Sequence, residues 1–138
     1  MTETTSVQQA NHELVAEHAQ LHELVEEIRG ARDRAQALGA LARLQEQVLA
    51  HFNLEERPGG LYDTLGVCVP AFRRPLAQLV DDHYRISASL RDMRERANAP
   101  WGTDGEMLRR DVARLAAALA EHEQRERQMV EQALAGES

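Results

Sequence analysis

The sequence predicts an all-α protein, an antiparallel up-down-up-down four-helix bundle that forms one domain over residues 1–138. Four long runs place apolar residues in alternating steps of three and four, the spacing of a helix face that packs into a core. Glycine and proline gather mainly between these runs. Aromatic residues make up only 4% of the chain, and Ala and Leu dominate its apolar residues, which is typical of helical proteins.

The first helix is expected over about residues 7–29, after a polar, frayed lead. Ser6 and Gln9 have the spacing of a capping box at its start, and Gly30 suits its end. The apolar stripe of this helix includes one histidine and reads Leu14, His18, Leu21, Val25 and Ile28.

The second helix is expected over about residues 37–57, and Pro58-Gly59-Gly60 is a strong signal for its end. Its stripe finishes with a histidine and a glutamate and reads Leu41, Leu44, Val48, His51 and Glu55. Residues 58–74 form the longest irregular stretch of the prediction. Because this stretch is rich in apolar residues, we expect a loop with one helical turn that packs across the end of the bundle.

The third helix is expected over about residues 75–97, with the stripe Leu76, Leu79, His83, Ile86, Leu90 and Met93. The fourth is expected over about residues 104–133, with the stripe Val112, Leu115, Leu119, His122 and Glu126. Thr103 and Glu106 have capping-box spacing at its start, and Trp101 in the preceding turn is expected to cover the core. Short connections within each helix pair imply antiparallel neighbours.

The chain therefore contains one pattern twice, as two helical hairpins. In each hairpin the first helix places one histidine in its stripe, and the second places a histidine and, four residues later, a glutamate. At a rise of about 1.5 Å per residue, the paired histidines fall within roughly 6 Å of the same height. Six side chains are expected to meet in one layer of the core: His18, His51, Glu55, His83, His122 and Glu126.

This layer favours a metal site. A buried carboxylate must protonate, pair or bind a metal, and no arginine lies in any stripe to neutralise these two. A single histidine in such a stripe is more simply explained as a hydrogen-bonded core residue. The whole set could also belong to a structural bundle without metal. The same polar pattern in all four stripes nevertheless favours metal binding. Imidazole and carboxylate suit zinc, iron or manganese. Six ligands exceed one tetrahedral zinc and fit two ions about 3.5–4 Å apart, bridged by both carboxylates.

Other residues near this layer are less certain from spacing. His22 lies one turn from His18 and about 40° around the helix, so we include it among the metal ligands; the alternative is that it faces a helix interface. The repeat has Ser87 at the corresponding position, which predicts an open coordination position there. Glu56 is expected on the surface. The spacing leaves open whether either tyrosine, Tyr62 or Tyr84, approaches the site.

Composition excludes several classes of function. A net charge of −7 gives no general attraction to nucleic acid or to an anionic membrane. The single cysteine, Cys68, excludes an intrachain disulfide and a thiolate zinc finger. No apolar run approaches the roughly 20 residues of a membrane span, and the N-terminus lacks the apolar core of a signal peptide. A cytoplasmic protein without nucleic-acid or membrane partners is therefore expected.

The chain resembles the hemerythrin-like, or HHE cation-binding, domain family over about residues 11–133. The motifs that carry the resemblance are Glu17-His18, His51-x-x-x-Glu55-Glu56, Asp82-His83 and His122-x-x-x-Glu126. The resemblance implies a non-haem centre of two iron ions with an oxo or hydroxo bridge, held by bridging Glu55 and Glu126 and by four terminal histidines. It also implies a role in binding or sensing oxygen, nitric oxide or peroxide, or in iron handling.

Two features distinguish the chain from the oxygen carriers of marine invertebrates, which use a His-x-x-x-His pair on the third helix and an Asp as second bridge. Here the pair is His18-x-x-x-His22 on the first helix, and both bridges are Glu. The bacterial-type members of the family are the better fit. Two alternatives stay open: a di-iron oxidoreductase that consumes peroxide or nitric oxide, and a metal-free helical interaction module.

Overall fold

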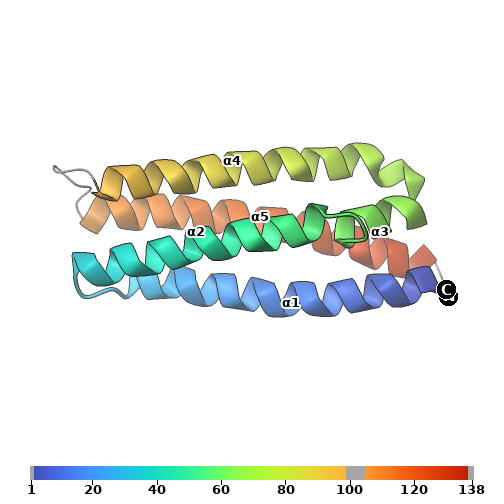
Figure 1. Ribbon diagram of the computed structural model, residues 1–138, viewed down its shortest axis with the longest axis horizontal. Coiled ribbons are helices and arrows are strands. Elements are labelled where there is room, and N and C mark those ends of the chain that lie inside the picture. Colours follow the sequence, from blue (N-terminus) through green and yellow to red (C-terminus); the bar gives the residue numbers. More distant parts are fainter. Residues whose placement is uncertain (1, 99–104, 137–138) are drawn as a thin grey trace.

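The computed structural model describes residues 2–98 and 105–136 and confirms the all-α four-helix bundle. Its four long helices are α1 (Thr2–Arg29), α2 (Arg34–Glu56), α4 (Arg73–Asn98) and α5 (Gly105–Gly136). A short helix, α3 (Leu61–Cys68), and a 3-10 turn, η1 (Pro70–Phe72), connect α2 to α4. In Figure 1 successive long helices run in opposite directions, and α5 finishes at the end of the bundle where α1 begins.

The first two long helices begin earlier than predicted. The side chain of Asp33 accepts a 2.8 Å hydrogen bond from the backbone N–H of Gln36, so this cap starts α2 at Arg34 rather than at residue 37. Helix α1 begins at Thr2, and the predicted frayed lead is therefore wrong. Ser6 consequently lies inside α1 and is not its cap.

The last two long helices also extend beyond the predicted ends. Helix α4 begins at Arg73, ahead of Pro75, since proline is tolerated in a first turn where its missing N–H has no partner to lose. Helix α5 continues to Gly136 and buries Ala133 against the core. Two predictions for the preceding turn, the Thr103 cap and the Trp101 cover, lie outside the described residues.

The segment between α2 and α4 is more ordered than predicted. Instead of one helical turn it holds α3 and η1, because Leu61 and Leu65 lie one turn apart and are both buried. The break after α2 lies where proline and glycine predicted it, and Gly59 has a φ of 78°, a conformation that favours glycine. Helix α3 contacts all four long helices, so it packs across the end of the bundle as expected.

The core has two apolar clusters separated by a polar layer. Each long helix contacts two others: α1 and α4 each contact both α2 and α5. The first cluster fills the end near the α1–α2 turn and includes Leu41, Leu44, Leu90 and Val112. The second fills the end near α3 and includes Leu61, Leu65, Leu79 and Val130. Between them lie polar side chains: the partly buried His18 and the buried residues His51, Glu55, His83, His122, Glu123 and Glu126.

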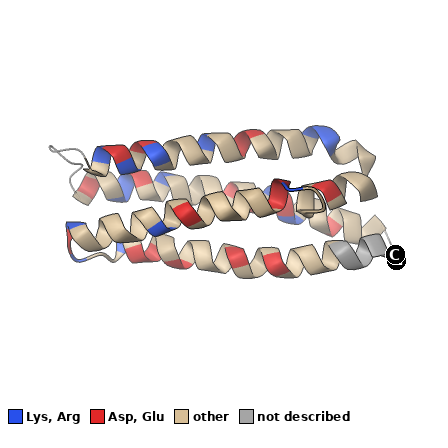
Figure 2. Cartoon of the chain, in the orientation of Figure 1, with Lys and Arg blue, Asp and Glu red and all other residues tan. Residues whose placement is uncertain are grey.

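Figure 2 shows charged residues along all four long helices, and among the described residues three of the carboxylates, Glu55, Glu123 and Glu126, are buried. From Val7 to Ile28 every charged residue of α1 is a glutamate, so this part of the helix carries negative charge. Among the described residues, no helix is both long enough and apolar enough to cross a membrane.

Candidate metal centre

Six residues from four helices form the polar layer. Helices α1 and α4 each supply one histidine, and α2 and α5 each supply a histidine and a glutamate one turn later. Five of the six are buried and His18 is only partly exposed. The layer corresponds to the six-residue set predicted from the apolar stripes: His18, His51, Glu55, His83, His122 and Glu126.

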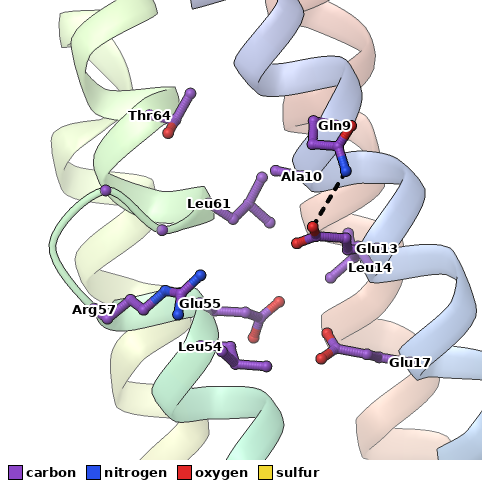
Figure 3. A pocket seen from close by; sticks show the side chains of 12 residues that line it. Gln9, Ala10, Glu13, Leu14, Glu17, Leu54, Glu55, Arg57, Leu61 and Thr64 are labelled. Carbon is purple, nitrogen blue, oxygen red and sulfur yellow. Dashed lines mark hydrogen bonds between the residues drawn. The ribbon is translucent and has the colours of Figure 1, made fainter.

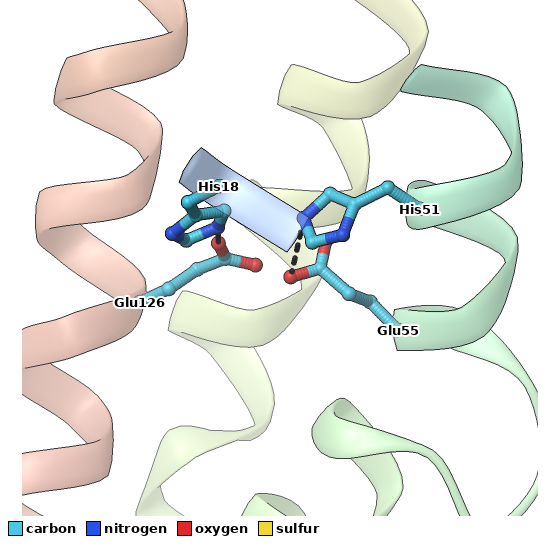
Figure 4. Close-up of side chains that lie close together, drawn as sticks. All are labelled: His18, His51, Glu55 and Glu126. Atoms are coloured by element: carbon cyan, nitrogen blue, oxygen red, sulfur yellow. Dashed lines mark ion pairs between the residues drawn. The ribbon is translucent and has the colours of Figure 1, made fainter. Parts of the chain in front are cut away.

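The first metal-binding group combines His18, His51, Glu55 and Glu126, and one ligand atom from each lies within 4.8 Å of the others. His18 Nε2 is 3.4 Å from Glu126 Oε1, and His51 Nε2 is 3.4 Å from Glu55 Oε2. Figure 4 shows the four side chains pointing toward one another. Two imidazoles and two carboxylates converge here from α1, α2 and α5.

The second group combines His83 and His122 with the same two glutamates. His83 Nε2 is 3.1 Å from Glu55 Oε1, and His122 Nε2 is 3.4 Å from Glu126 Oε2. In each carboxylate, therefore, one oxygen faces the first group and the other faces the second. This is the arrangement needed for two carboxylates to bridge a pair of metal ions.

The donor atoms of the first group fit a metal cation. Four buried atoms there, one from each residue, have no hydrogen-bond partner: His18 Nε2, His51 Nε2, Glu55 Oε2 and Glu126 Oε1. Such a buried polar atom costs roughly 1–3 kcal/mol when it is left unsatisfied. A cation with nitrogen and oxygen ligands would satisfy all four at once, and this ligand chemistry suits iron, zinc or manganese.

An outer set of carboxylates faces the Nδ1 atoms of the four histidines. Glu17 Oε2 lies 2.8 Å from His51, Glu56 Oε2 lies 2.6 Å from His83, and Asp82 Oδ2 lies 3.3 Å from His122. Glu123 Oε2 lies 3.9 Å from His18. Because an ionised carboxylate only accepts hydrogen bonds, the bonded Nδ1 atoms carry the proton. That tautomer leaves the inward Nε2 free to bind a metal, as in carboxylate–histidine–metal triads.

These four pairs link the long helices in a closed ring. The carboxylate on α1 bonds to the histidine on α2, the one on α2 to α4, and the one on α4 to α5. Glu123 on α5 completes the ring by facing the histidine on α1. Each outer carboxylate is also the immediate chain neighbour of a residue in the polar layer. This adjacency is the sequence signal that could have identified the ring.

Tyr62 on α3 places its hydroxyl inside the second group. The hydroxyl donates a 2.6 Å hydrogen bond to Glu126 Oε2 and lies 2.8 Å from His83 Nε2 and 3.3 Å from His122 Nε2. Burial, together with the charges of Glu126 and Glu55, raises the pKa of Tyr62 far above its ordinary value. The phenol is therefore neutral in the metal-free protein and keeps its proton.

The pKa values of the two shared carboxyls, Glu55 and Glu126, are shifted in opposite directions. Burial and the neighbouring Glu126 charge raise the pKa of Glu55 well above its usual range. Burial alone would also raise the pKa of Glu126, but the neighbouring Glu55, His122 and His18 hold that pKa well below its usual range. The opposite directions mean that in the metal-free protein the two carboxyls share one proton.

The structure places the remaining predicted residues differently. His22 lies outside both groups, about half exposed, with Nε2 2.9 Å from Glu123 Oε2. The 40° rotation expected from sequence carries it to the α1–α5 interface, which favours the alternative to ligation. Glu56 is not a simple surface residue, because it bonds to His83. Tyr62 reaches the site, whereas Tyr84 is 70% exposed.

Comparison with known protein families gives one finding. The model of the hemerythrin HHE cation binding domain matches residues 9–134 of this chain. No curated protein and no solved structure gave a match. The matched range includes both groups of ligands and all four outer carboxylates.

Proposed function

Because the chain belongs to the hemerythrin HHE cation-binding domain family, we propose that its polar layer holds two iron ions, at which a small ligand binds. The observation that supports this best is the pair of groups that share Glu55 and Glu126. His18 and His51 would hold one ion, and His83 and His122 the other. Each shared glutamate would give one oxygen to each ion.

The ligand class follows from the charge of this set. Four neutral imidazoles and two carboxylates leave a pair of ions with net positive charge, which favours small anionic or oxygen-derived molecules. Oxygen, nitric oxide and peroxide are the proposed ligands. Iron supplies open coordination positions and one-electron chemistry for them when it is bound. A location in the cytoplasm, expected from the sequence, stays a prediction.

The surrounding residues hold the site in place and bury most of its ligands. Phe52 stacks on the ring of His83 at a centroid distance of 3.7 Å, which limits rotation of that imidazole. Apolar clusters lie on both sides of the layer. The Tyr62 hydroxyl gives Glu126 a hydrogen bond and provides a proton at the second group.

The test is the metal content and visible spectrum of protein purified from an iron-replete host. We expect two irons per chain and absorption in the near ultraviolet and visible, both lost in Glu126→Ala and retained in the exposed control Glu121→Ala. Zinc that iron cannot displace would contradict the proposal. A protein that takes up no metal would instead be a helical interaction module.

Tyr62 favours one alternative, an oxidoreductase that consumes peroxide. Disproportionation of two peroxide molecules to water and oxygen needs no external electron donor, but it needs a group that returns protons, and the buried phenol is suitably placed. Steady turnover of excess peroxide, abolished in Glu55→Ala and reduced in Tyr62→Phe at unchanged iron content, would establish this activity. Parent protein that consumes no more than one equivalent of peroxide per centre would exclude it.

A further inference from the structure

A pocket of about 370 Å³ connects the surface to the metal-binding layer. It lies between α1, α2 and α3, and Glu55 is among the residues that line it. Figure 3 shows Glu13 and Glu17 on α1 directed across the pocket toward Glu55 on α2. The pocket therefore approaches the first group, formed by α1, α2 and α5, and not the region of Ser87 where spacing predicted an open position.

The three carboxylates lie at increasing depth. Glu13 is exposed, Glu17 has a side chain that is 29% exposed, and Glu55 has one that is 3% exposed. Glu55 is the least exposed of the three, and its Oε2 is buried and has no hydrogen-bond partner. Glu17 already contacts the centre, since its Oε2 lies 2.8 Å from Nδ1 of His51. A continuous series of oxygen ligands thus leads inward to an unsatisfied donor atom.

We propose that this pocket is the port through which divalent iron reaches the centre, with Glu13 and Glu17 holding the cation on its way to Glu55. The proposal rests on the proposed function, because it assumes a metal centre beneath the pocket. Carboxylates are suitable transient ligands for a hydrated divalent ion. Negative charge in a concave surface also raises the local concentration of cations and lowers that of anions. Among the described residues that line the pocket, Arg57 is the only cationic one, and its charge opposes this effect.

On the side of α3, described side chains cover the second group. The Tyr62 hydroxyl occupies the space between His83, His122 and Glu126, and Phe52 covers one face of the His83 ring. Metal that enters from the α1 side would therefore meet the first group and pass to the second through the shared glutamates. The port and the two shared glutamates would thus form one path for the metal.

Charge variants test the port through the rate of metal uptake. Metal-free protein is mixed anaerobically with ferrous ion, and unbound iron is trapped at intervals with a coloured chelator. Glu13→Gln should slow uptake about two- to fivefold without changing the final iron content, and Arg57→Gln should accelerate it by a similar factor. Salt at about 1 M should abolish both differences. Glu23→Gln, which removes the same charge from α1 away from the pocket, should match the parent protein.

The same variants should change the rate at which azide binds to iron-loaded protein in the direction opposite to their effect on ferrous-ion uptake. The anion should bind faster in Glu13→Gln and more slowly in Arg57→Gln. A general change in protein stability or opening would shift the rates of both ions in the same direction. Opposite shifts for ferrous ion and azide therefore support the port, and parallel shifts contradict it.

Steric variants test the same path without changing charge. Leu54 lines the pocket and is 41% exposed, while Leu49 lies on the same helix outside it and is 43% exposed. Leu54→Trp should slow uptake of ferrous ion severalfold, and Leu49→Trp should not. If Glu13→Gln and Leu54→Trp both load at the parent rate and to the parent iron content, the port lies elsewhere while the proposed function stands. Absence of uptake by the parent protein would overturn both.

Discussion

At the scale of single residues, the outer carboxylates determine what the inner histidines can do. Each histidine could present either ring nitrogen to the core, and only the proton on Nδ1 leaves Nε2 available to a metal. The bonds from His51 to Glu17 and from His83 to Glu56 hold that choice in place. Toward these histidines the carboxylates are positioning residues, because they act on the metal site through the imidazole.

Removing one outer carboxylate should therefore weaken metal binding. In Glu56→Leu the affinity of the second group should fall about 10- to 100-fold, since the imidazole of His83 loses its orienting partner. Glu56→Gln retains an acceptor and should recover most of the loss. Glu121→Leu, next to His122 but exposed, serves as control. Competition titrations with a chelator measure the affinity. If Glu56→Leu and Glu56→Gln bind metal equally well, the bond does not orient the ring.

The buried histidines also predict the pH dependence of the metal-free protein. Burial and the neighbouring His122 lower the pKa of His83 from 6.5 to about 3. Between these values the unfolded chain binds a proton at this histidine and the folded chain does not. Stability is therefore lost as the pH falls from about 6.5 toward 3, by up to about 1.4 kcal/mol per pH unit. Denaturant unfolding between pH 4 and 6 measures this slope.

Two histidine variants isolate this effect. In His83→Phe, which keeps a ring beside Phe52, the slope should be shallower by about 1.4 kcal/mol per pH unit. In His12→Phe, at an exposed position, the slope should match that of the parent. Parallel slopes in all three proteins would mean that His83 takes up its proton in the folded state.

At the scale of elements, local pattern predicted the four long helices because each has an apolar stripe with helical spacing. It did not predict α3, whose eight residues are too few for that periodicity to stand out and which depends on contacts with the long helices. The outer carboxylates Glu56 and Glu123 were missed for a related reason. Their partners lie on other helices, so the pairing depends on helix rotation, which one helix alone does not specify.

Helix α3 depends on the link that precedes it. A Cβ at Gly60 would collide with the carbonyl oxygen of Leu54 and lie 2.9 Å from that of Arg57, so Gly60→Ala must displace backbone. We expect this variant to be destabilised by about 1–3 kcal/mol and to bind metal more weakly, since Tyr62 moves with α3. Gly39→Ala, where a Cβ meets nothing within 4 Å inside α2, should be more stable by about 0.5–1 kcal/mol. Thermal unfolding of both variants is the measurement, and equal melting temperatures would contradict the clash.

At the scale of the whole molecule, the polar layer provides a binding site but makes the metal-free fold less stable. It separates two apolar clusters that would otherwise form one continuous core. The unpaired donors of the first group include Glu55 Oε2, and each favours unfolding until a cation is present. Any ligand that binds only the folded state adds stability by mass action, about 2.7 kcal/mol at a concentration 100 times its Kd. Metal content should therefore decide how stable the bundle is.

Glu55→Leu tests whether the polar layer destabilises the metal-free protein and stabilises the metal-bound one. Without metal, leucine replaces a carboxyl whose Oε2 has no partner, so the melting temperature should stay unchanged or rise. Glu126→Leu should instead be destabilised even without metal, because the hydroxyl of Tyr62 loses the acceptor of its 2.6 Å bond.

With ferrous ion under anaerobic conditions, the parent melting temperature should rise and that of Glu55→Leu should rise much less, since the variant lacks one of the two shared ligands. Melts in chelator and in excess ferrous ion, with Glu121→Leu as the exposed control, give all of these differences. An equal loss for Glu55→Leu in both conditions would mean that Glu55 stabilises the fold and does not bind metal.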